Sequence, residues 1–129
     1  MPKIDEIADG VYRICVVYED IGLQFNHFLV KDDEPLLFHA GLNGMFGEIP
    51  EGVSKLIDPS TLKWVGFSHF ESDECGSLNK WLELAPRAEP LCTSLGAMLS
   101  VNDFAIRPAR GMNDGETLTT GSRTYRFCS

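Results

Sequence analysis

The feature that most restricts the fold of this chain is a buried strand followed at once by an acidic loop and a helix. Residues 62–67 (LKWVGF) are largely apolar and predict a strand. The polar residues 68–76 follow directly, and apolar residues then recur at helical spacing across residues 78–84 until Pro86 ends the pattern. This strand–loop–helix unit favours a layered α/β protein.

Further strands are expected on the N-terminal side of this unit. β-Branched and aromatic residues predict strands at 11–17 and 25–30. A polar turn at residues 31–35 then leads into a third strand at 36–39. A short helix is expected within residues 49–56, where a proline and a glycine weaken the helical pattern.

The C-terminal part continues the alternation of strands and helices. Strands are expected at 91–93, 104–106 and 124–128, with a helix between the first two that Ser94 can cap. A domain seldom ends on a strand without a tail. We therefore expect residues 1–129 to be one partial domain whose continuation beyond residue 129 is missing.

Composition limits the partners and the location of the chain. The 19 Asp and Glu against 11 Lys and Arg give a formal charge of −8, which opposes binding to nucleic acid. The N-terminus lacks an apolar signal core, and no apolar run approaches the roughly 20 residues of a membrane helix. We therefore expect a cytoplasmic protein without a membrane partner. The cysteines show no CxxC spacing, which excludes a zinc ribbon.

The residues suited to chemistry are an imidazole and three carboxylates, at His69, Glu71, Asp73 and Glu74. Because alternate residues of an extended segment point the same way, His69, Glu71 and Asp73 can converge on one point. Imidazole nitrogen and carboxylate oxygen are borderline-to-hard ligands, and this set, which is not a thiolate site, suits iron, manganese or zinc. An alternative stays open, in which Ser72 or Asp73 only caps the following helix and no metal binds.

The segment 67–76 (FSHFESDECG) resembles the HxExDHxG signature of flavodiiron proteins. That family has the metallo-β-lactamase fold, and its stand-alone relatives are called oxygen-binding di-iron proteins. The similarity extends over residues 7–12, 25–38 and 84–93, so it covers nearly all of this chain but only about half of the family's domain. The resemblance implies an α/β (α+β) fold, namely the first half of a metallo-β-lactamase-like αββα sandwich, with a mixed sheet and flanking helices.

The resemblance also implies a set of metal ligands. By position, His69 and Glu71 would bind one metal and Asp73 the other. Glu74 stands where the family has a second histidine, and as a carboxylate it is a candidate fourth ligand. The family's other ligands come from sequence beyond the last predicted strand. His39 stands where relatives often carry an acid, and we expect a structural role for it more than a place at the site.

The implied cofactor is iron, in a di-iron centre in the intact family, with zinc or manganese as the other candidates. No flavin-binding segment is evident in the sequence. The implied function is the binding of dioxygen or another small gas ligand, or the reduction of oxygen or nitric oxide by an oxidoreductase, in a truncated form of the family. Whether the chain is an enzyme stays open.

Two other functions stay open at this point. One is a metal-free remnant or interaction module without activity. The other is a zinc-dependent hydrolase, which is disfavoured because Glu71 replaces the middle histidine of the HxHxDH pattern. Since half a sandwich leaves one sheet face uncovered, either the chain is a fragment of a longer protein or two copies pair as a homodimer.

Overall fold

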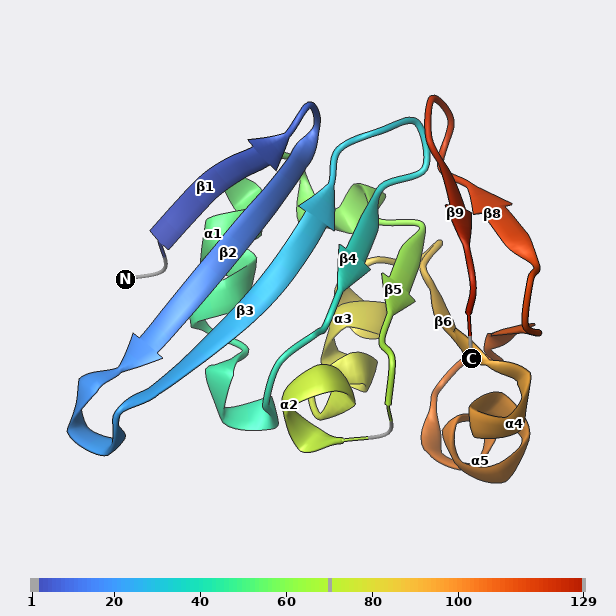
Figure 1. Cartoon of the computed structure of the whole chain (residues 1–129). Coiled ribbons are helices and arrows are strands. Elements are labelled where there is room, and N and C mark those ends of the chain that lie inside the picture. Colours follow the sequence, from blue (N-terminus) through green and yellow to red (C-terminus); the bar gives the residue numbers. More distant parts are fainter. Residues whose placement is uncertain (1–2, 70, 129) are drawn as a thin grey trace.

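The computed structural model describes residues 3–69 and 71–128 and is built around one seven-stranded sheet. The strands lie side by side in chain order, antiparallel from β1 to β4 and parallel from β4 to β7 (Figure 1). The predicted mixed sheet is therefore present. Its strands are β1 (Lys3–Ala8), β2 (Val11–Tyr18), β3 (Leu23–Val30), β4 (Leu36–Phe38), β5 (Trp64–Gly66), β6 (Glu89–Thr93) and β7 (Arg110–Met112). A separate hairpin follows, formed by β8 (Thr117–Thr119) and β9 (Thr124–Arg126).

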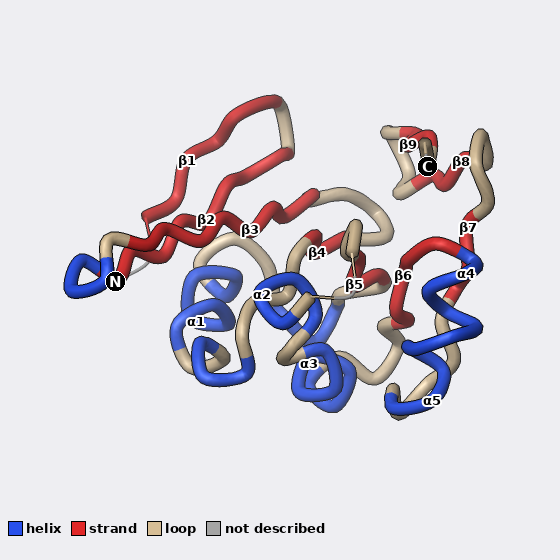
Figure 2. The backbone as a smooth tube through the Cα atoms, turned by 60° about the horizontal axis from the view of Figure 1, so that its bottom comes forward, coloured by secondary structure: helices blue, strands red, loops and turns tan. Residues whose placement is uncertain are grey.

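Short helices cover one face of this sheet (Figure 2). The helices of the chain are η1 (Glu19–Ile21), which lies in the turn between β2 and β3, η2 (Asn43–Met45), α1 (Glu48–Ser54), η3 (Pro59–Thr61), α2 (Ser72–Cys75), α3 (Leu78–Leu84), α4 (Ser94–Gly96), the π-helical η4 (Ala97–Val101) and α5 (Asn102–Phe104). In Figure 2, α1, α2 and α3 lie together beneath the strands. Among the residues that the structure describes, no helix combines the length and apolar character that crossing a membrane requires.

The larger core lies between the sheet and these helices. Ile14, Leu37 and Val65 enter it from the strands, and Leu78 and Trp81 enter it from α3, all with side chains fully buried. Strand residues fill this layer because alternate side chains of β2, β4 and β5 point to the same face. The layer fixes α2 and α3 beneath the carboxyl ends of β4 and β5.

A smaller apolar cluster occupies the opposite face of the sheet. Leu36, Trp64 and Leu91 lie there, and Leu118 of the β8–β9 hairpin packs against them. The hairpin covers only part of this face, since Val17 farther along the sheet stays 52% exposed. The pairing of two copies through this face stays a prediction.

Most predicted elements are confirmed, and two details near residue 100 are wrong. Residues 104–106 form no strand, because the Asn79 side chain of α3 donates to the carbonyl of Phe104 and accepts from the amide of Ile106. These bonds engage backbone groups that a strand would have used for pairing. The helix after β6 is capped by Thr93, whose hydroxyl accepts from the amide of Gly96, and not by Ser94.

The turn after β3 is tied to the β8–β9 hairpin by Asp32. Its carboxylate accepts hydrogen bonds from the amide and hydroxyl of Ser122 and from the hydroxyl of Thr120. These bonds, chiefly the one from the Ser122 amide, lower the pKa of Asp32 from 3.8 to about 2. The lowered pKa means that this contact stabilises the fold above pH 4 and is lost as the pH falls toward 2.

We expect the amide resonance of Ser122 to report this titration directly. In an NMR titration of the whole protein, its midpoint should lie near pH 2, well below the ordinary aspartate value of about 3.9. The Asp32→Asn variant should show no such transition at Ser122. A midpoint close to pH 4 in the unmodified protein would contradict the assignment.

Candidate metal centre

Three side chains at the start of α2 bring ligand atoms together. One nitrogen or oxygen from each of His69, Glu71 and Glu74 lies within 4.8 Å of the others, and we call this set the His–Glu–Glu triad. His69 Nδ1 is 3.8 Å from Glu71 Oε1 and 3.7 Å from Glu74 Oε2. The triad lies where the chain leaves β5 and enters α2, at the carboxyl ends of parallel strands (Figure 1). Ligand sites in α/β sheets commonly lie at this edge.

The triad contains three of the four residues predicted from the sequence. Asp73 is exposed and lies outside the set. The reason is that α2 begins at Ser72, so the alternation of an extended segment ends at Glu71 and the helix turns Glu74 back toward His69. No side-chain cap bond is formed at the start of this helix. Metal binding by Asp73 stays a prediction.

Glu74 is the buried member of the triad, with a side chain only 10% exposed. Its Oε1 accepts the amide protons of Ser68 at 3.0 Å and of His69 at 2.8 Å. The same oxygen lies 3.1 Å from Nε2 of His39. Burial alone would raise the pKa of Glu74, but the His69 amide and the His39 imidazole outweigh it and hold that pKa below its ordinary value. Glu74 is therefore a carboxylate at neutral pH and supplies a fixed negative charge.

His39 lies beside Glu74 but is not a member of the triad, and the structural role expected for it stays a prediction. It follows β4 directly, and β4 pairs in parallel with β5, so their carboxyl ends bring His39 beside the segment that holds Ser68 and His69. The signal in the sequence is that two neighbouring strands each end on a histidine-containing loop. Reading that signal requires knowing that the two strands are adjacent and parallel.

A buried histidine forms a hydrogen bond with the backbone of His39. His27 is 1% exposed, and its Nδ1 lies 2.7 Å from the carbonyl oxygen of His39. Burial lowers the pKa of His27, so the ring is neutral and Nδ1–H donates to that carbonyl. The interaction fixes the position of the loop that begins at His39.

Further hydrogen bonds connect the loop at residues 39–41 to α2 and α3. The Ala40 amide donates to the carbonyl of Glu74 at 2.7 Å, and the Ser77 amide donates to the carbonyl of Gly41 at 3.0 Å. The Ser77 hydroxyl and the Trp81 indole N–H both donate to the carbonyl of Ala40, at 2.9 and 3.2 Å. These hydrogen bonds join the loop at residues 39–41 to α2 and α3.

A thiol near the triad adds no further ligand. Cys75 is buried and donates to the carbonyl of Glu71 at 3.3 Å. Burial raises the pKa of the Cys75 thiol to about 11, so it stays protonated at neutral pH. The donor atoms of the site are therefore nitrogen and oxygen, as the sequence indicated.

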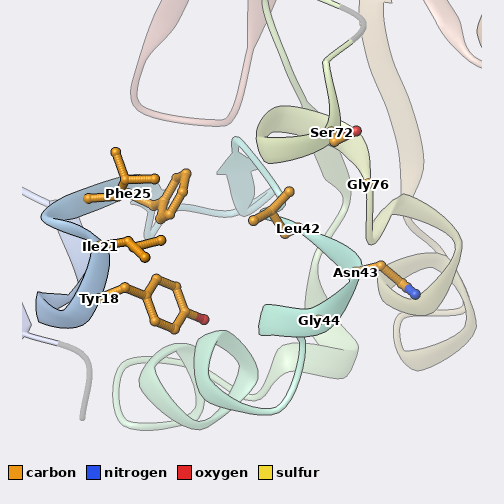
Figure 3. A pocket seen from close by; sticks show the side chains of 9 residues that line it. Tyr18, Ile21, Phe25, Leu42, Asn43, Gly44, Ser72 and Gly76 are labelled. Carbon is orange, nitrogen blue, oxygen red and sulfur yellow. The ribbon is translucent and has the colours of Figure 1, made fainter.

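The triad opens to solvent beside an apolar groove. The side chains of His69 and Glu71 are 74% and 62% exposed, in contrast to buried Glu74. A groove of about 730 Å³ passes next to Ser72, the residue that follows Glu71. Figure 3 shows Tyr18, Ile21 and Phe25 on one side of the groove, facing Leu42, Asn43 and Gly44 on the other.

Comparison with known proteins identifies a family for most of the chain. The family described as "ODP family beta lactamase" matches residues 23–122 of the chain. Rubredoxin-oxygen oxidoreductase of Megalodesulfovibrio gigas is 29% identical over 83% of this chain and 27% of its own length. Flavo-diiron protein FprA2 of Clostridium acetobutylicum is 28% identical over 95% of this chain and 34% of its own length. The chain thus spans about a third of these relatives.

Among solved structures, rubredoxin oxygen:oxidoreductase from Desulfovibrio gigas superposes with a TM-score of 0.81 at 27% identity. The superposition covers 95% of this chain and 34% of that one. Seven strands and the helices beneath them therefore share one arrangement with part of a larger protein.

Proposed function

The chain belongs to the ODP beta-lactamase family, and from this premise we propose that its His–Glu–Glu triad holds an iron ion of the non-haem kind for binding dioxygen or another small gas ligand. Family membership and the superposition confirm the expected metallo-β-lactamase-like fold. The metal, its ligands and the gas are the proposal, since the chain spans only about a third of the relatives named above.

The observation that carries the proposal is the convergence of His69, Glu71 and Glu74. Ligand atoms held by one ion at about 2.1 Å lie about 3.0–3.4 Å apart, so the three side chains, now 3.7 and 3.8 Å apart in two pairs and within 4.8 Å in all, must move closer to bind one ion. His69 and Glu71 are exposed and free to move, while Glu74 is fixed. One imidazole and two carboxylates form the kind of donor set that non-haem iron prefers. The residues present therefore fit the ion.

The residues of the site have distinct roles in this proposal. Ionised Glu74 places a negative charge in the wall of the site, and this charge attracts a cation to that point. Glu71 adds a second carboxylate, and His69 adds an imidazole nitrogen. Iron bound by three protein ligands would supply open coordination positions for a gas ligand.

The names of the relatives support iron and oxygen over the other candidates. One relative is named an oxygen oxidoreductase and another a flavo-diiron protein. We propose for this chain the combination that the two names indicate, oxygen binding at iron. A second iron bound through Asp73 stays a prediction, and so does reduction of the bound gas, which requires an electron donor.

Elemental analysis of the purified chain tests the proposal. After anaerobic loading with Fe²⁺ and removal of free metal, we expect about one equivalent of iron per chain, because one triad is present among the described residues. Exposure of the loaded protein to dioxygen should then change its near-ultraviolet absorption. Less than about one-tenth of an equivalent of iron, manganese or zinc after both aerobic and anaerobic preparation would overturn the proposal and favour a metal-free remnant.

A further inference from the structure

His39 touches the one buried carboxylate of the triad without belonging to the triad. We propose that His39 is a positioning residue, which holds one oxygen of Glu74 so that the other oxygen faces the metal position between His69 and Glu71. This inference rests on the proposed metal site and extends it to a residue outside the predicted ligands.

The two oxygens of Glu74 have separate partners. Oε1 accepts from the amides of Ser68 and His69 and lies 3.1 Å from Nε2 of His39. Oε2 is the oxygen that lies 3.7 Å from Nδ1 of His69, within the triad. Because Oε1 already accepts two amide hydrogen bonds, Oε2 is the oxygen that Glu74 offers a cation. Nε2 of His39 lies 3.1 Å from Oε1 but forms no hydrogen bond among the described residues, so it acts on Oε1 through close contact. The geometry of Glu74 as a ligand is therefore set by the groups that hold Oε1.

The backbone of His39 is held in a conformation that few residues adopt. Its φ is 70°, and within the described part of the chain it is the one non-glycine residue with positive φ. This left-handed region is disfavoured for residues with a Cβ, and such residues persist where surrounding contacts fix them. Here the His39 amide donates to the carbonyl of Gly66 at 2.8 Å, and its carbonyl accepts from His27. The unusual backbone aims the ring at Glu74.

The ring itself is also confined. It stacks on Phe38, with ring centroids 4.5 Å apart and planes 28° from parallel. Its side chain is 25% exposed, and the buried Nε2, which has no hydrogen-bond partner among the described residues, lies 3.1 Å from Oε1 of Glu74. Groups that orient a metal ligand in this way typically raise metal affinity about 10–100-fold without touching the metal.

A double-mutant cycle on Zn²⁺ affinity tests the inference, with Zn²⁺ as a redox-inert probe. His39→Asn keeps a side chain that tolerates positive φ, and Glu74→Gln keeps the shape of the carboxylate without its charge. We expect His39→Asn to weaken Zn²⁺ binding about 10–100-fold. We expect the double variant to bind as weakly as Glu74→Gln alone, because His39 acts only through Glu74.

Lys63→Gln is the matched control, since it breaks the 2.7 Å ion pair with Glu89 away from the site and should leave Zn²⁺ affinity unchanged. All affinities are measured well below the unfolding temperature of each variant, so lost stability alone does not move them. Additive losses in the double variant, or unchanged affinity in His39→Asn, would overturn the role of His39 while the metal site stands. A wild-type chain that binds no Zn²⁺ and no Fe²⁺ would overturn both the role and the proposed function.

Discussion

The Glu71→Ala variant is expected to fold normally and to lose metal binding. Glu71 supplies one of two carboxylates in the triad, and its side chain is 62% exposed. Among the described residues, its ion-pair partner is His69, whose Nδ1 lies 3.8 Å from Glu71 Oε1. The Glu71 side chain does not cap α2, so alanine removes no helix cap. Loss of a charged ligand should exceed the roughly 10–100-fold cost of losing a supporting contact. Isothermal titration with Fe²⁺ under argon, together with circular dichroism, measures both expectations.

Asp73→Ala is the matched control for Glu71→Ala. Asp73 is also an exposed acid at the start of α2, two residues farther along, but it lies outside the triad. Removing it changes the net charge by the same amount. Any difference in iron binding between the two variants therefore reflects the position of the removed carboxylate and not the change in net charge. We expect Asp73→Ala to retain the first equivalent of iron. If Asp73→Ala loses that equivalent and Glu71→Ala keeps it, the assignment of ligands is wrong.

The Gly41→Ala variant is expected to destabilise the fold strongly and to weaken metal binding with it. Gly41 has a φ of 95°, which is strained for alanine. An added Cβ would overlap Cδ1 of the fully buried Ile49 and approach Cε1 of His27 to 3.2 Å. Strain and overpacking together should cost about 2–5 kcal/mol. Because Gly41 belongs to the loop that carries His39, the remaining folded protein should also bind Zn²⁺ more weakly.

Gly22→Ala separates the backbone effect from the clash. Gly22 also has positive φ, at 66°, but an added Cβ there would meet nothing within 4 Å. This variant should lose only the strain component, about 1–2 kcal/mol, with unchanged Zn²⁺ affinity. Urea denaturation of both variants gives the two free energies of unfolding. Equal losses would mean that the packing around Gly41 is looser than described.

The elements that carry the site could be predicted because their patterns are local. The apolar run before Ser68 and the helical spacing from Leu78 to Leu84 each depend on neighbouring residues only, and both elements are present. The strand predicted at 104–106 is absent because the Asn79 side chain of α3 hydrogen-bonds to the backbone of this segment. Long-range hydrogen bonds of this kind leave no local signal in a sequence.

The site was predictable only in part, for the same reason. His69 and Glu71 follow from the motif, but whether Asp73 or Glu74 joins them depends on the residue at which α2 begins. His39 and Glu74 each depart from the pattern of the resembled family, and no local pattern connects two positions so far apart in the chain. The structure places them 3.1 Å apart, through the parallel pairing of β4 and β5.

The most direct test of the metal centre is an anomalous difference map from crystals grown anaerobically with Fe²⁺ and measured at the iron absorption edge. We expect one peak about 2.0–2.2 Å from His69 Nδ1, an oxygen of Glu71 and Oε2 of Glu74, with Oε1 still held by the Ser68 and His69 amides. A fully occupied peak elsewhere, or no peak while these three side chains are well ordered, would contradict the account.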